Sequence, residues 1–185
     1  MPRLAPLLAL LAATGCGFGS ISPVFSDASA TNDPRLVGTW RDSASQEGAV
    51  ISLDSGTGYK IVYTEDNGKT AHFVATLGVV GSTRILNVSP DDLPGDLSDL
   101  YKSLLLPLHA PVIIDSAGAV LRFRMFEPDS IKAYLKRNPR AIAYVDREDR
   151  VVLTAPTADV QKFVATLLAQ RGFLGEMNEW RRKSP

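Results

Sequence analysis

The sequence predicts an α+β domain of mostly antiparallel strands that closes into a barrel or a strongly bent sheet, with about three packed helices. Three observations lead to this fold class. Short stretches in which apolar and polar residues alternate recur about every ten residues from residue 36 onward. Turn signals rich in Gly, Asn and Ser separate these stretches. Three other segments carry apolar residues at helical spacing.

The first half of this domain predicts five strands in a meander. The strands are expected at 36–43, 49–54, 59–66, 70–80 and 83–89. In the third strand Tyr59, Ile61 and Tyr63 share one face, as in a half-buried strand. Asn67 and Gly68 both tolerate positive φ, and therefore predict a tight hairpin between the third and fourth strands.

The second half predicts helices between further hairpins. A helix is expected over 96–106, ended by Pro107, and is followed by a hairpin of strands 108–115 and 120–127. A short helix beginning at Pro128 should end at Asn138, because the residue before Pro139 avoids helical angles. A third hairpin is expected over 141–146 and 150–155. The last helix should cover 158–171 with Thr157 as its N-cap, and 173–185 resembles a tail anchored only by Trp180.

The first 33 residues predict export and anchoring. Arg3 precedes an apolar run over 4–13, which has the layout of a secretory signal and is too short to span a bilayer. Thr14-Gly15-Cys16 resembles the bacterial lipobox, which implies cleavage before Cys16 and acylation of its thiol. We therefore expect a signal peptide over 1–15, the lipidated cysteine and a flexible tether over 16–33, and a single domain over 34–185. The resemblance implies a place in the cell envelope. Gly17, where an aspartate would favour inner-membrane retention, favours the outer membrane.

Two further resemblances bear on the fold. Gly38-Thr39-Trp40 resembles the G-x-W signature that opens the first strand of lipocalins, which implies a lipocalin-like barrel whose tryptophan plugs the closed end. A longer series of motifs is similar to a type of uncharacterised bacterial lipoprotein, and implies a lipid anchor and a shared fold without a known activity. Those motifs are GTW (38–40), Tyr-x-x-x-Tyr (59–63), Phe-x-Ala-x-Leu (73–77), LPLH (106–109), PDSIKAYL (128–135) and LTAPT (153–157).

Composition excludes several function classes. The formal net charge is +0, so no basic surplus points to nucleic acid. Cys16 is the only cysteine, so the chain forms no internal disulfide. The two histidines lack metal-ligand spacing, no G-x-S-x-G motif occurs, and Gly56-x-Gly58 precedes a strand rather than a helix. No catalytic set, metal site or cofactor is therefore predicted.

These observations favour a non-enzymatic binding module for a small apolar ligand, attached to a membrane through the lipid on Cys16. The candidate lining residues are Trp40, Tyr59, Ile61, Tyr63, Phe73, His109, Leu121 and Phe123. Alternatively, the same side chains simply fill the barrel, as they do in small barrels. Two other functions stay open: a scaffold that binds or assembles envelope proteins, and a hydrolase in which His109 is the base.

Overall fold

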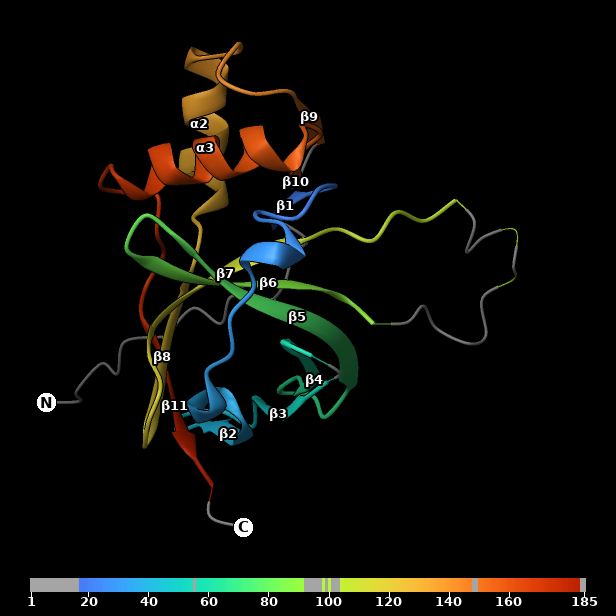
Figure 1. Ribbon diagram of the computed structural model, residues 1–185, viewed down its shortest axis with the longest axis vertical. Coiled ribbons are helices and arrows are strands. Elements are labelled where there is room, and N and C mark those ends of the chain that lie inside the picture. The colour runs from blue at the N-terminus through green and yellow to red at the C-terminus, as the bar shows by residue number, and fades with distance from the viewer. Residues whose placement is uncertain are drawn as a thin grey trace, which may run out of the picture.

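The computed structural model describes residues 17–54, 56–91, 98, 100, 104–147 and 150–183. Within these ranges the chain forms a closed antiparallel barrel of eight strands, a separate three-stranded sheet and two α-helices (Figure 1). The closed barrel confirms the expected antiparallel architecture and decides against an open bent sheet. Cys16, and with it the expected lipidation and signal peptide, lies outside the described residues.

The first seven strands of the barrel correspond to the predicted five-strand meander and the hairpin predicted after it. Their bounds are β2 (Gly38–Asp42), β3 (Gly48–Leu53), β4 (Gly58–Thr64), β5 (Thr70–Val80), β6 (Thr83–Pro90), β7 (Ala110–Ser116) and β8 (Val120–Met125). Each pairs with the next in antiparallel register. Gly68, with φ of 82°, lies in the turn between β4 and β5, as its sequence predicts.

The eighth strand corrects the expectation of a C-terminal tail. β11 (Asn178–Arg182) pairs with β8 on one side and with β2 on the other, and so closes the barrel. Its inward residue Trp180 is 8% exposed, whereas its neighbours Glu179 and Arg181 are exposed. A strand of this length with one large apolar residue has almost no hydrophobic alternation, which explains why its pattern escaped sequence analysis.

The segment after Cys16 packs on the domain instead of forming a flexible tether. β1 (Gly17–Ser20) pairs in parallel with β10 (Arg150–Leu153), and the chain then runs down the front of the barrel in Figure 1. Val24 and Phe25 are 0% and 1% exposed. A Cβ on Gly78 would lie 2.7 Å from the Phe25 ring, so the missing side chain makes room for this contact. Two 3₁₀ turns, η1 (Asp27–Ser29) and η2 (Pro34–Leu36), complete the segment.

The helices lie together with the small sheet above the barrel in Figure 1. α2 (Pro128–Arg137) and α3 (Thr157–Leu168) bury Ile131, Leu135, Phe163 and Leu167 in a second core outside the barrel. The third hairpin is confirmed as β9 (Tyr144–Arg147) and β10, but it forms the small sheet with β1 instead of joining the barrel.

Helix number and bounds differ from expectation. The described residues contain two α-helices, not three; the expected helix at 96–106 falls largely on residues that are not described, and 104–106 are not helical. Thr157 is the first residue of α3 and not its N-cap, and α3 ends at Leu168. None of the described helices has the length and apolar character needed to cross a bilayer.

Candidate functional site

One end of the barrel is plugged by η2 and the residues around it. Leu36 is fully buried, and its carbonyl accepts a hydrogen bond of 2.8 Å from Nε1 of Trp40, which is also fully buried. Arg182 of β11 lies across this plug, with its guanidinium carbon 4.3 Å from the centre of the Trp40 ring. The same guanidinium donates to the carbonyls of Arg35 and Val37 at 2.6 and 2.5 Å. The last strand therefore holds the plug in place.

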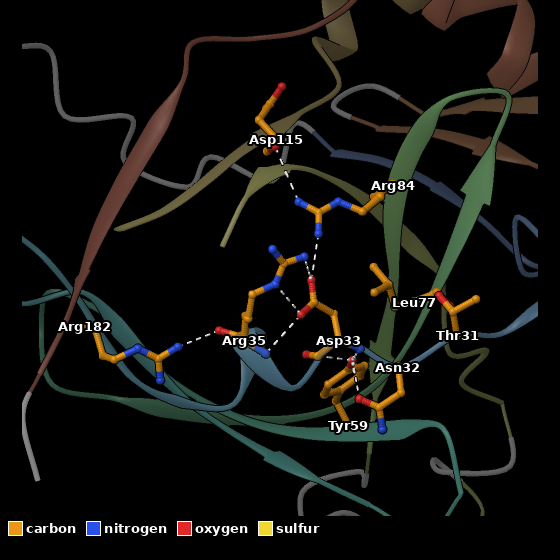
Figure 2. Close-up of polar contacts among 9 residues, drawn as sticks. All are labelled: Thr31, Asn32, Asp33, Arg35, Tyr59, Leu77, Arg84, Asp115 and Arg182. Atoms are coloured by element: carbon orange, nitrogen blue, oxygen red, sulfur yellow. Dashed lines mark hydrogen bonds and ion pairs between the residues drawn. The ribbon is translucent and has the colours of Figure 1, made fainter. Parts of the chain in front are cut away.

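Asp33 caps η2 and joins it to the barrel wall (Figure 2). Its carboxylate accepts hydrogen bonds from Nε and Nη2 of Arg35, both at 2.8 Å, and from Nη1 of Arg84 on β6, also at 2.8 Å. These cations keep the pKa of Asp33 below its ordinary value, although burial acts in the opposite direction. The Tyr59 hydroxyl lies 2.6 Å from the Asp33 backbone N–H, which donates to it. The polar groups at the plugged end are thus engaged in holding the fold together.

Exposure of the inward-facing side chains rises with distance from the plug. Along β4, Tyr59 is 0% exposed, Ile61 is 8% exposed and Tyr63 is partly exposed. Four residues of strand place Tyr63 about 13 Å from Tyr59. Along β8, Leu121 is 4% exposed, Phe123 is partly exposed and Met125 is 51% exposed. The barrel interior is therefore filled near the plug and offers apolar surface at its other end.

Aromatic rings gather at that other end. The rings of Tyr63 and Trp180 are stacked with centres 6.2 Å apart, and Phe123 meets Trp180 edge to face at 4.9 Å. Phe73 of β5 is partly buried against the same core. We call Tyr63, Phe73, Phe123, Met125 and Trp180 the aromatic end. Such a group can bind an apolar molecule by burying its surface and stacking on its rings.

Tyr63 is the polar member of the aromatic end. Burial, together with the nearby carboxylates of Glu47, Glu65 and Asp66, raises the pKa of Tyr63 to about 12. The hydroxyl therefore stays protonated at neutral pH. This proton is shared with the Glu47 carboxylate through a side-chain hydrogen bond, while the ring contributes apolar surface.

His109 lies apart from this group, at the start of β7. Its Nδ1 lies 3.0 Å from Nδ2 of Asn87, whose Oδ1 accepts from the Val24 N–H. The Asn87 amide is thereby oriented so that His109 Nδ1 accepts, leaving the proton on Nε2. Burial lowers the pKa of His109, and the charge of Asp27 opposes this shift. The structure sets an amide, not a carboxylate, against the ring, and the backbone of His109 pairs with Ser20.

The predicted lining residues thus divide into three groups. Trp40, Tyr59, Ile61 and Leu121 lie in the filled part of the barrel, whereas Tyr63, Phe73 and Phe123 belong to the aromatic end. His109 lies on the outer connection to the N-terminal segment.

Trp180 was not predicted as a site residue, and Arg182 was not predicted to lie across the plug. Both residues lie on a strand with a single large apolar residue, so no hydrophobic pattern marked them. Sequence reasoning also gave no role to Asp33, whose contacts join η2 to β6.

No group of three or more His, Cys, Asp or Glu side chains among the described residues is placed to hold a metal ion.

Comparison with known proteins adds no assignment to this geometry: no family model, no curated protein and no solved structure matches the chain.

Proposed function

We propose that this chain is a cell-envelope lipoprotein, anchored by lipid on Cys16, whose barrel binds a small apolar ligand at the aromatic end. The anchor rests on the sequence: a short apolar run followed by Thr14-Gly15-Cys16. Because Gly17 already belongs to β1, the lipid would hold the domain directly at the membrane surface, without a long spacer. Gly17 after the cysteine favours the outer membrane as the location.

One observation carries the ligand proposal. Side chains on the inward faces of β4 and β8 become more exposed toward the aromatic end, although they continue the apolar pattern of the core. A contiguous exposed apolar patch, unlike single exposed apolar residues, favours binding to a ligand or a partner. The expected ligand is small and contains a ring or a short hydrocarbon chain, because the barrel beyond Ile61 is already filled.

Two measurements test the proposal separately. Mass spectrometry of the mature protein should show an acylated N-terminal cysteine, and Cys16→Ser should abolish the acylation and release the protein from membranes. Native mass spectrometry of the protein released gently from membranes should show an adduct of lipid-fragment size. Phe123→Asn should remove this adduct, whereas Val50→Asn, a change of an exposed residue on the outer face of β3, should leave it. Unmodified Cys16 would refute the anchor, and equal adducts in both variants would refute the site.

A second candidate is favoured by a different observation. Leu104 and Leu106, which precede β7, are 76% and 74% exposed. Exposed leucines so close in sequence favour binding to an envelope protein. In this case Leu104→Asn combined with Leu106→Asn should reduce chemical crosslinking to that partner in membranes, whereas Leu53→Asn, at a leucine 50% exposed on β3, should not. Unchanged crosslinking in the double variant would exclude this surface.

A further inference from the structure

A cleft of about 480 Å³ lies outside the barrel, away from the aromatic end. Its walls come from the turn between β5 and β6, from β7 and β8, and from the turn that follows α3. This volume falls within the range of about 300–1,000 Å³ that is usual for small-molecule sites. None of the residues of the aromatic end lines it.

Cationic side chains dominate the charge of this cleft. Arg84, Arg124 and Arg171 line it, whereas Asp115 is its single acidic lining residue. The Asp115 carboxylate is held by Arg124 through two bonds of 3.0 and 2.6 Å, so this pair is neutral. Arg84 pairs with Asp33, but Asp33 is shared with Arg35 (Figure 2). The cleft and its ion-pair partners together carry four guanidinium groups and two carboxylates, which leaves a surplus of two positive charges. The cations are Arg35, Arg84, Arg124 and Arg171, and the anions are Asp33 and Asp115.

Arg171 supplies one of these surplus charges. It is exposed, and it makes no ion pair or hydrogen bond within the part of the chain that the structure describes. Ser82 and Thr83 add hydroxyl groups to the same cleft. An arginine whose donors are unused, in the same cleft as two hydroxyls, has the chemistry that recognises a carboxylate or a phosphate.

Apolar side chains line the rest of the cleft. Leu168 and Leu174 are partly buried and offer apolar surface, whereas Ile113 is 1% exposed and only backs the cleft. A ligand that fills the cleft would therefore place a hydrocarbon part against these two leucines and its charge near Arg171.

We propose that this cleft is a second binding site, for a small organic anion that joins a carboxylate or phosphate to a short hydrocarbon chain. Such a ligand would gain charge-assisted hydrogen bonds at the rim and apolar burial below. The site does not depend on ligand binding at the aromatic end or on the lipid at Cys16.

Calorimetric titration of the full chain carrying Cys16→Ser, at constant ionic strength, tests the proposal with three probes. Hexyl phosphate carries both parts of the expected ligand, inorganic phosphate carries the anion alone, and hexanol carries the chain alone. Hexyl phosphate should bind saturably and more tightly than either of the other two. Arg171→Gln should weaken it about tenfold or more, the usual loss for one charge-assisted hydrogen bond.

Arg140→Gln is the matched control, because Arg140 is an exposed arginine after α2 that does not line the cleft. It should change the affinity for hexyl phosphate less than twofold. Equal weakening by both variants would show diffuse charge attraction and overturn the site, as would the absence of saturable binding at millimolar probe. Inorganic phosphate binding as tightly as hexyl phosphate would overturn the hydrocarbon part. An affinity for hexyl phosphate that Arg171→Gln leaves unchanged would place the probe at the aromatic end and would overturn the cleft as its site.

Discussion

Arg182→Met is expected to loosen the plugged end of the barrel. Methionine keeps an apolar stem over Trp40 but loses the three hydrogen bonds that Arg182 donates to the carbonyls of Arg35, Val37 and Gly118. These bonds are solvent-exposed, so each contributes about 0.5 kcal/mol, at the low end of the usual range. The cation–π contact adds about 0.5–1 kcal/mol. The free energy of unfolding should therefore fall by roughly 2 kcal/mol.

Urea denaturation followed by tryptophan fluorescence measures this loss. For a domain of this size, 2 kcal/mol corresponds to a fall of about 4–8 °C in Tm. Arg181→Met is the matched control, because Arg181 is exposed on the outer face of the same strand, and it should change stability by less than about 0.5 kcal/mol. Equal effects of the two variants, or no effect of Arg182→Met, would refute the role assigned to Arg182.

Three further predictions concern the N-terminal segment and its contacts. Phe25→Ala should cost about 3–5 kcal/mol and expose residues 17–33 to limited proteolysis, because the ring is 1% exposed against the barrel; an unchanged cleavage pattern would contradict the packed segment. Asp33→Asn should destabilise the protein by about 2–3 kcal/mol, measured by urea denaturation, because it leaves Arg35 and Arg84 facing each other without the charge between them. The lowered pKa of His109 means that the unfolded chain binds its proton more tightly than the folded chain. The stability that neutral His109 contributes is fully present above the ordinary pKa of 6.5 and should be lost as the pH falls below it, while His109→Gln should flatten that part of the stability profile.

The barrel was predictable because its strands carry their information locally. The inward residues of β4 alternate with polar ones, and Asn67-Gly68 marks the hairpin that follows. The helix after Pro128 was predictable for the same reason, since its apolar stripe and its end at Asn138 lie within ten residues of one another. Such signals need no knowledge of distant contacts.

The parts that sequence analysis missed depend on long-range contacts. β11 is a strand because β2 and β8 each offer it an edge, and these strands are distant in sequence. β1 likewise depends on β10, and the burial of Phe25 depends on the empty space at Gly78. The candidate site was predicted in part. Tyr63, Phe73 and Phe123 were on the correct face, but the position of the plug, which decides where the barrel is filled, required the contacts of Asp33.

The two tryptophans provide the most direct test of the proposed ligand site, because Trp40 packs against the plug and Trp180 belongs to the aromatic end. Trp180 contacts Tyr63 and Phe123, and 5-fluorotryptophan labelling gives one ¹⁹F resonance for each tryptophan. Trp40→Phe assigns the two signals. Titration with a neutral apolar ligand, such as N-phenyl-1-naphthylamine, should shift the Trp180 resonance saturably and leave the Trp40 resonance in place. A shift of Trp40 alone, or no shift of either resonance, would contradict ligand binding at the aromatic end.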